Sequence, residues 1–488
     1  MGVCPVERGE DASPGQGGTA GQPDADACAV LERRLDEARA LSQACDGLHG
    51  LTPHLSARSG MSAGQASGAW GFIAASLVFW LFAPDAVSLV AGTLAMLLFG
   101  FVIALRLAAA MFAPSAPSGT AKPRVSDEDL PLLTYLVPLL REANVVASLA
   151  RAIEALDYPS GRIEVKFLVE SDDEDTLAAL RWLRLPGWFE IIPVPPGLPR
   201  TKPKALNYGL HFSRGEIVAV LDAEDRPAPS QPREAVAALR AGGPDLAVVQ
   251  APLLIHNQSE NWLAEQFAME YAIHFRIWLP FLVRIGWPLP LGGTSNYFLR
   301  RKLVEAGGWD AWNVTEDADI GIRLARLGGR AGVIVSPTFE EAPIRFGHWL
   351  AQRTRWMKGH LQTWLVVTRH PASAIRELGA WGFMGFAVTL GGSLAASLLH
   401  GPVMIWIGLG LISPAIDLQG WHAAFLGAGY GSAVLAALAA RVSGPGFWSF
   451  ARMLFYWPLL SIAMAAAVWE LVKRPHYWAK TPHGVTRR

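Results

Sequence analysis

Hydrophobic residues fall into long blocks that are separated by stretches of mixed polarity. The first block holds two apolar runs broken at Pro84-Asp85, and each is long enough, at about 20 residues, to cross a bilayer as a helix. The pattern predicts six segments: 1–65 as a disordered or short-helix segment, 66–112 as two transmembrane helices, 113–345 as a soluble domain, 346–376 as an amphipathic interfacial helix region, 377–472 as about four transmembrane helices, and 473–488 as a basic tail.

The C-terminal block predicts spans at 381–399, 402–416, 421–440 and 452–472, of which the second is short enough to be a broken or interfacial helix instead. Basic residues flank this block. They are Arg369, Arg376, Lys473, Arg474, Lys480, Arg487 and Arg488. Because basic flanks stay inside and the span count is even, we expect a multi-pass protein of the inner (cytoplasmic) membrane, with both ends and the soluble domain in the cytoplasm.

In the soluble region, apolar runs alternate with helical patterns. Strands are predicted at 132–137, 165–169 and 217–221, and helices at 143–156 and 176–183. This βαβ alternation predicts an α/β fold with an open parallel sheet. The strand at 217–221 is apolar throughout, as expected for a central strand covered on both faces.

Acidic residues follow that central strand as Asp222, Glu224 and Asp225. The carboxyl ends of parallel strands border the ligand crevice of such folds, and carboxylate oxygens can hold Mg²⁺ or Mn²⁺ together with substrate phosphates. A solvated acidic turn before Pro227 and Pro229 explains the same residues equally well.

Two further groups are candidates for nucleotide contact. Glu170, Asp172 and Asp173 follow the second strand, where a carboxylate can bind a ribose or a uracil, although acids also suit a plain helix N-terminus. Lys202 and Lys204 lie in the stretch 201–207, and an ammonium beside a metal loop suits a diphosphate. A basic surface loop is the alternative.

Two motifs follow later in the chain. Glu316 and Asp317 come after Thr315, which is placed to cap a helix, so capping explains some acid here without requiring the pair. The motif Gln352-Arg353-Thr354-Arg355-Trp356 lies on an amphipathic helix that puts Gln352, Arg355 and Trp356 on one face. Such a helix is also typical of an interfacial membrane anchor.

Composition adds two limits. The chain has 42 basic and 42 acidic side chains, so its bulk charge gives no reason to expect nucleic acid as a partner. The three cysteines, Cys4, Cys28 and Cys45, lack metal-ligand spacing and are expected to be reduced thiols.

Taken in order, these motifs resemble the processive, membrane-embedded family 2 glycosyltransferases, such as the bacterial cellulose and hyaluronan synthases. The matching stretches are Val137-Pro138 with Glu142, 170–173, 204–207, 222–224, 292–295, 315–317 and 352–356. The resemblance implies a GT-A nucleotide-sugar domain, Rossmann-like and inserted between transmembrane α-helices. It also implies inverting transfer from a nucleotide sugar, a UDP-sugar being expected, with Mg²⁺ or Mn²⁺ as cofactor.

The resemblance also implies residue roles. Asp222 and Glu224 match the metal motif, Asp317 with its neighbour Glu316 matches the catalytic base, and Gln352, Arg353, Arg355 and Trp356 match the helix for acceptor and diphosphate. Glu170, Asp172, Asp173 and Lys204 match the nucleotide-binding positions. Glu224 stands where the family usually has a second Asp, so either Glu224 or Asp225 is the second metal ligand, and the first acidic pair is displaced to Asp172-Asp173.

Three functions follow from these observations. The leading one is a polymerising β-glycosyltransferase that builds an exopolysaccharide, with export or periplasmic subunits as further partners and no PilZ-like domain for cyclic-di-GMP control. The alternative is single transfer to a lipid acceptor. A transporter is disfavoured, because ionisable residues within the apolar blocks lie near their ends, at Asp85, Arg106, Asp417 and Glu470.

Overall fold

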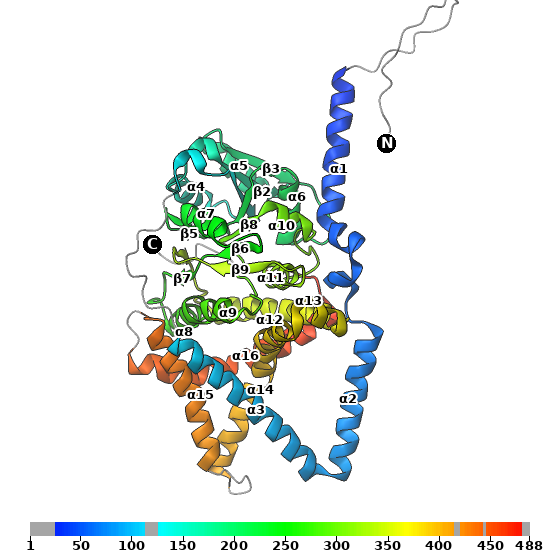
Figure 1. The fold of residues 1–488 in the computed structure, drawn as a ribbon, viewed down its shortest axis with the longest axis vertical. Coiled ribbons are helices and arrows are strands. Elements are labelled where there is room, and N and C mark those ends of the chain that lie inside the picture. The colour runs from blue at the N-terminus through cyan, green and yellow to red at the C-terminus, as the bar shows by residue number, and fades with distance from the viewer. Residues whose placement is uncertain (1–24, 113–124, 414–419, 443–445, 481–488) are drawn as a thin grey trace, which may run out of the picture. The chain divides into compact units, whose positions relative to one another are not determined.

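The computed structural model describes residues 25–112, 125–413, 420–442 and 446–480 (Figure 1). The chain divides after Ala40 into two units, and the helix α1 (Ala25–Leu51) begins in the first and ends in the second. The segment expected to be disordered, residues 1–25, lies almost wholly outside the described residues, as do Cys4, Arg487 and Arg488. Everything below concerns the second unit.

A seven-stranded mixed sheet forms the centre of the soluble region. Its strand order is β3-β2-β1-β4-β8-β6-β9. The bounds are β1 Leu133–Leu139, β2 Ile163–Glu170, β3 Phe189–Val194, β4 Ile217–Val220, β6 Leu246–Gln250, β8 Asn296–Leu299 and β9 Arg330–Val333. The expectation of an α/β GT-A fold is confirmed, and β1, β2 and β4 correspond to the three predicted strands.

The three predicted strands are parallel, as expected, but β8 runs antiparallel to both β4 and β6, so the whole sheet is mixed. After β6 the chain leaves the sheet at its carboxyl edge and forms two helices. It then re-enters from the same edge, which reverses the direction of β8. The remaining strands, β5 (Arg226–Pro227), β10 (Thr338–Glu340) and β7 (Leu253–Ile255), form a small second sheet.

Helices pack on the main sheet over a continuous apolar core that includes Tyr135, Phe167 and Val236. They are α4 Val146–Glu154, α5 Glu174–Trp182, α6 Lys202–His211, α7 Gln231–Ala241, α10 Arg300–Glu305 and α11 Glu316–Arg326. Short 3₁₀ turns lie at Pro53–Leu55, Ala57–Ser59, Asp127–Asp129 and Ser160–Arg162. Every residue of β2 is buried, which fits its sequence of apolar residues together with charged residues that form ion pairs.

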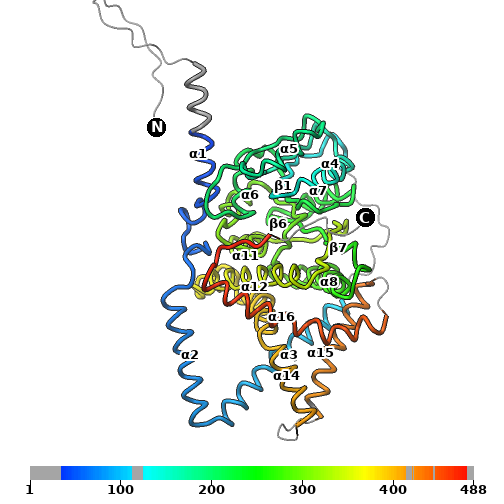
Figure 2. The backbone as a smooth tube through the Cα atoms, turned by 180° about the vertical axis from the view of Figure 1, so that it is seen from behind, coloured from blue at the N-terminus to red at the C-terminus, as the bar shows by residue number. Residues whose placement is uncertain are grey.

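A layer of helices separates the sheet from the long apolar helices (Figures 1 and 2). It contains α8 (Trp262–Ile273), a π-helical turn at His274–Trp278, α9 (Leu279–Ile285) and α12 (Phe346–Thr368), which carries the Gln352–Trp356 motif. Trp349 of α12 is fully buried against α8 and Tyr456 of a later helix. This layer therefore joins the soluble region to the apolar helices.

Five helical runs among the described residues are long and apolar enough to cross a membrane. They comprise α2 Ala63–Phe82, α3 Pro84–Met111, the run Pro371–Ile412, α15 Gly420–Ala439 and α16 Phe447–Lys473. The run Pro371–Ile412 combines α13 (Pro371–Phe386), a π-helical turn at Ala387–Gly391 and α14 (Gly392–Ile412).

The two spans predicted on either side of Pro402 therefore lie in one continuous helical run. Proline removes a helical hydrogen bond, but neighbouring helices can satisfy the freed backbone groups. Here the hydroxyl of Ser461 on α16 accepts from the Gly401 N–H at 2.8 Å and donates to the Ser397 carbonyl. This hydroxyl thus bridges two backbone groups in the turn that precedes Pro402.

Candidate functional site

A pocket of about 400 Å³ opens at the carboxyl edge of β1, β2 and β4. The strands place Glu142, Glu170 and Asp222 around it, since their carboxyl ends meet at this edge. The start of α11 and the middle of α12 close the pocket from the other side. Most of the residues predicted from sequence thus lie in one place.

Lys202 and Asp222 form the closest charged pair in this pocket, with Lys202 Nζ 2.5 Å from Asp222 Oδ1. Lys202 begins α6 and also donates to the Gly293 carbonyl at 2.6 Å. Burial alone would lower the pKa of Lys202, but the carboxylates of Asp222 and Glu316 raise it above its usual range. Lys202 is therefore a fixed positive charge beside the acidic turn. The stretch 201–207 made it a candidate together with Lys204, whereas the family resemblance implied a role for Lys204 alone.

Asp225 points away from the pocket. Its side chain is 1% exposed, and Oδ2 accepts from the Asp222 N–H at 3.0 Å and from the Thr294 hydroxyl. Burial, together with the nearby carboxylates of Glu340, Glu224 and Asp222, raises the pKa of Asp225 well above its usual value. The structure therefore places Asp225 as a buried support of the turn and not in the pocket, whereas Asp222 and Glu224 line the pocket.

Glu316 and Asp317 open helix α11, and both line the pocket. Thr315 makes no side-chain capping bond; instead Asp317 Oδ1 accepts from the N–H of Ala318. Burial raises the pKa of Asp317, while Lys202 and Arg355 oppose that rise. Burial also raises the pKa of Glu316 to about 7, with Lys202 at 3.7 Å opposing it. A carboxylate with a raised pKa in a pocket suits general base chemistry.

Gly293 lies at the centre of the charged groups. A Cβ atom added there would lie 3.3 Å from Asp317 Oδ2, 3.6 Å from Lys202 Nζ and 3.8 Å from Asp222 Oδ2. The missing side chain thus leaves a space bounded by one cation and two carboxylates. Any larger residue would fill the space between them.

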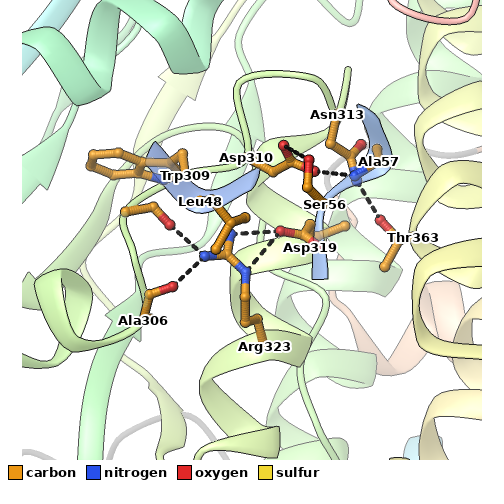
Figure 3. A network of polar contacts seen from close by, with 12 residues as sticks. Leu48, Ser56, Ala57, Ala306, Trp309, Asp310, Asn313, Asp319, Arg323 and Thr363 are labelled. Atoms are coloured by element: carbon orange, nitrogen blue, oxygen red, sulfur yellow. Dashed lines mark hydrogen bonds and ion pairs between the residues drawn. The ribbon is translucent and has the colours of Figure 1, made fainter. Parts of the chain in front are cut away.

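A buried polar network holds the loop that leads to Asp317 (Figure 3). Arg323 pairs with Asp319 at 2.6 Å and donates to the carbonyls of Ala306 and Gly308. Asp310 accepts from the Ser56 hydroxyl and the Ala57 N–H, which belong to the segment before α2. Burial raises the pKa of Asp310 to about 6. The segment 56–57 is therefore part of the support beneath the start of α11.

The acids after β2 separate into different roles. Glu170 lines the pocket and pairs with Lys204 at 2.9 Å, and burial raises the pKa of Glu170. Lys204 is 0% exposed, so its ammonium faces Glu170 and not the pocket. Lys202, and not Lys204, lines the pocket, where the family resemblance placed Lys204. These two lysines are two residues apart on α6, so they point to different sides.

Asp172 and Asp173 do not line the pocket. Asp172 is exposed and binds Arg200 through both oxygens, at 2.6 and 2.8 Å. Asp173 is buried, caps α5 by accepting from the Thr176 N–H and also accepts from the Arg141 N–H. The oxygens of both residues already have protein partners, so nucleotide contact by them stays a prediction that this structure does not support, and the helix N-terminus alternative describes Asp173.

All four predicted residues of α12 line the pocket, but they differ in their partners. Arg353 is buried and pairs with Glu270 at 2.7 and 2.8 Å, so its charge is balanced within the protein. The guanidinium of Arg355 instead lies over the ring of Trp478 at 5.2 Å. The buried Oε1 of Gln352 has no hydrogen-bond partner in the described chain. Gln352 and Arg355 are therefore better placed than Arg353 to meet a ligand.

The segment after α16 returns to the pocket, which the sequence did not suggest. Trp478 and Lys480 both line it, and Lys480 Nζ lies 2.9 Å from Glu142 Oε1. Lys358 of α12 holds the segment by donating to the Tyr477 carbonyl at 2.7 Å. The aromatic and basic composition of 476–480 was the only sequence signal for this segment. Without knowledge of the fold, that composition indicates a tail at a membrane surface.

Comparison with known proteins shows the family to which the chain belongs. Residues 217–469, which include β4, the start of α11 and the α12 motif, match the family described as Glycosyl transferase family group 2. The chain belongs to this family. It is a glycosyltransferase, as the sequence predicted.

This glycosyltransferase is similar in sequence to several curated proteins. A beta-monoglucosyldiacylglycerol synthase from Synechocystis sp. is 25% identical over 380 residues, covering 72% of this chain and 75% of that protein. The probable glycosyltransferase YdaM from Bacillus subtilis is 28% identical and covers 49% and 57%, respectively. A beta-monoglucosyldiacylglycerol synthase from Trichormus variabilis is 29% identical and covers 48% and 50%. The chain thus spans little more than half of these last two relatives.

Two solved structures are also similar to this glycosyltransferase. The mannosyltransferase PcManGT from Pyrobaculum calidifontis, solved in complex with GDP-Man and Mn²⁺, is 20% identical with a TM-score of 0.47, covering 78% of this chain and 97% of that chain. S. aureus TarS, residues 1–349, is 12% identical with a TM-score of 0.35, covering 72% and 97%.

The glycosyltransferase pocket has a donor set that fits a divalent metal. Asp222 and Glu224 are hard oxygen ligands that line one pocket. Within the described residues no group of three or more His, Cys, Asp or Glu side chains is arranged to hold a metal ion by itself. Mg²⁺ commonly uses one or two carboxylates and takes its other ligands from phosphates and water. The two carboxylates fit that pattern if substrate phosphate completes the shell.

Proposed function

We propose that this glycosyltransferase moves a sugar from a nucleotide sugar, expected to be a UDP-sugar, to the hydroxyl of a lipid acceptor at a membrane, with inversion at the anomeric carbon. The observation that carries this proposal is the pocket itself, in which Lys202, Asp222 and Asp317 face Gln352, Arg355 and Trp356. A donor diphosphate and an acceptor hydroxyl both need such groups. The names of the Synechocystis and Trichormus relatives support a lipid as the acceptor.

The residues suggest how the transfer proceeds. Asp317 accepts the proton of the acceptor hydroxyl while that oxygen bonds to the anomeric carbon. The bond from the anomeric carbon to the diphosphate oxygen breaks at the same time, and the diphosphate leaves with the electron pair. Lys202 and Arg355 stabilise its negative charge. Asp222 and Glu224 would hold Mg²⁺ or Mn²⁺, which would supply further neutralisation of the diphosphate.

We also propose that the protein is a multi-pass membrane protein whose soluble domain and two ends share the cytoplasmic side, so that an even number of the five apolar runs crosses the membrane. The segment before α2 supports this, because Ser56 and Ala57 bind Asp310 of the soluble domain. The segment after α16 supports it too, because Lys480 binds Glu142. Nucleotide sugars are made in the cytoplasm, so the pocket must open there.

A second candidate function is processive synthesis of a β-linked exopolysaccharide, with export partners. It is favoured by Trp356, whose indole lines the pocket and offers a flat apolar face to a sugar ring. The two functions share the donor site and differ in whether the product leaves after one transfer.

The experiment that tests the proposed function incubates the purified full chain, in vesicles containing diacylglycerol, with labelled UDP- and GDP-sugars and Mg²⁺ or Mn²⁺. We expect a labelled lipid carrying one sugar. A product that grows into a long polysaccharide under excess donor would establish the second function instead. Absence of transfer from every nucleotide sugar to any acceptor would contradict both.

A further inference from the structure

A second cavity, of about 600 Å³, lies among the apolar helices beside the donor pocket. Helices α3, α14, α15 and α16 build most of its wall, with side chains such as Phe99, Ile407 and Leu426. The two cavities share part of their lining, which we call the neck. The neck residues are Glu270, His274, Trp278, Arg353, Trp356, His360, Thr389 and Ser393. The neck residues therefore border both cavities.

The wall of the membrane cavity suits an apolar occupant. Apolar side chains bind hydrocarbon by removing its surface from water. A sugar chain in the same place would leave many hydroxyls without hydrogen-bond partners, which is unfavourable. The volume lies within the roughly 300–1,000 Å³ that is typical of ligand cavities. The cavity is thus better matched to acyl chains than to a growing glycan.

Polar side chains of the membrane cavity outside the neck already have hydrogen-bond partners in the protein. Arg106 donates to the Ser432 hydroxyl at 3.2 Å and to the Gly429 carbonyl, with its guanidinium over the Trp457 ring. His400 is hydrogen-bonded to the Tyr430 hydroxyl at 2.9 Å. These hydrogen bonds connect α3 and α14 to α15, so the polar groups already bind other residues of the protein.

The ionisable neck groups are balanced in charge. Arg353 and Glu270 form a two-bonded ion pair. Burial lowers the pKa of His274 and of His360 to about 4, so both rings are uncharged at neutral pH. These four side chains together carry no net charge. An uncharged headgroup passes such a neck more readily than a phosphate, which needs an unpaired cation.

We propose that the membrane cavity binds the acyl chains of an uncharged lipid alcohol, such as a diacylglycerol, and that the neck passes its hydroxyl to the donor pocket. This inference rests on the proposed function, because it names the class of lipid that accepts the sugar. It places the acyl chains among α3, α14, α15 and α16 and leaves the nucleotide in the separate donor pocket.

Two glycines of α14 provide a matched test. Gly392 lines the membrane cavity but not the donor pocket, and a Cβ added to it would meet no atom within 4 Å. Gly392→Phe should therefore fill the cavity without a clash at its Cβ. Gly408 also has no atom within 4 Å of an added Cβ, but it lies outside the cavity wall. Gly408→Phe is the control.

The measurement is photo-crosslinking of a photoactivatable dioleoylglycerol to the full-length proteins in detergent, with UDP binding measured on the same samples. We expect wild type and Gly408→Phe to crosslink equally, and Gly392→Phe to fall by roughly tenfold or more with UDP affinity unchanged. Unlabelled dioleoylglycerol should compete better than dioleoyl phosphatidic acid, which has the same acyl chains but carries a charged phosphate in place of the free hydroxyl.

Undiminished crosslinking of Gly392→Phe would overturn the inference, as would stronger competition by the phosphatidic acid. If Gly392→Phe loses UDP binding as well, Gly92→Phe on the α3 wall replaces it with the same expectation, since its added Cβ also meets no atom within 4 Å. A wild type that glycosylates dioleoylglycerol, with Gly392→Phe keeping the same KM for that lipid, contradicts only the cavity. A wild type that crosslinks here yet makes no glycolipid contradicts only the proposed function.

Discussion

Lys202 Nζ lies 2.5 Å from Asp222 Oδ1, so the first residue of α6 neutralises the carboxylate that follows β4. The same ammonium lies 3.7 Å from Glu316 Oε1. One lysine thus sets the electrostatics of both the candidate metal turn and the candidate base.

This relationship predicts a shift in the pH dependence of transfer. Asp317 acts as a base only when it is ionised, so activity should fall as the pH drops through its raised pKa. Lys202 is the largest charge that opposes the rise. Lys202→Met should therefore raise the pKa of Asp317 further and move the acid limb of kcat/KM to higher pH. An acid limb that stays in place would show that Asp317 is not the titrating base.

Replacement of the base gives a second prediction. Asp317→Asn should lower kcat by roughly 10²- to 10⁴-fold, because the acceptor proton loses its receiver. UDP affinity should change little, since the amide keeps the size of the carboxylate. Initial rates and isothermal titration of UDP measure the two effects. A near-native kcat in the variant would mean that Asp317 only caps α11 and is not the base.

The metal turn predicts opposite outcomes for two aspartates. Asp222→Asn should weaken activation by Mg²⁺ or Mn²⁺, with an effect on turnover of several kcal/mol. Asp225→Asn should remain close to wild type, because Asp225 is buried with a raised pKa and an amide resembles its neutral form. Metal titrations of initial rates compare the two variants directly. The reverse order of sensitivity would make Asp225 the ligand and Asp222 the support.

A fourth prediction concerns the segment after α16. Trp478→Ala removes the ring beneath Arg355, a contact worth about 1–2 kcal/mol when shielded from water, so the donor KM should rise roughly 5- to 30-fold. Trp182→Ala is the control, because that indole is 89% exposed on α5. Steady-state kinetics with varied donor give the comparison. An equal change in both variants would rule out a specific role for Trp478.

The buried network beneath α11 predicts a loss of stability. Arg323→Met leaves Asp319 buried without its partner, which should cost about 3–5 kcal/mol of unfolding free energy. Arg301→Met breaks a largely exposed pair with Glu305 and should cost about 0–1 kcal/mol. Thermal unfolding in detergent should show a clearly lower midpoint only for Arg323→Met. Equal midpoints would mean that the network is not needed to hold the loop.

Much of this fold follows from local sequence. The apolar run of β4 identifies a buried strand, and the acids after it lie at the carboxyl edge as parallel topology requires. Pro84 begins α3 and separates it from α2, as its position between two apolar runs predicted. These features depend on neighbours in the chain, so a pattern is sufficient to find them.

What could not be predicted depends on contacts between distant residues. Neither Lys202 nor Lys204 carries a local signal that says which one faces the pocket. The direction of β8 depends on where the chain re-enters the sheet. The hydroxyl that binds the backbone beside Pro402 comes from Ser461, some 60 residues later. The partners of Asp173 and Asp225 are likewise set by the folded loops.

The return of Trp478 to the pocket ties activity to the order of protein synthesis. Residues 474–480 are translated after all the apolar helices, so the ribosome supplies this wall of the pocket last. A chain in which α16 has not packed against α12 and α14 cannot bring Trp478 to Arg355. The pocket therefore gains the wall formed by Trp478 and Lys480 only after α16 has been made and packed.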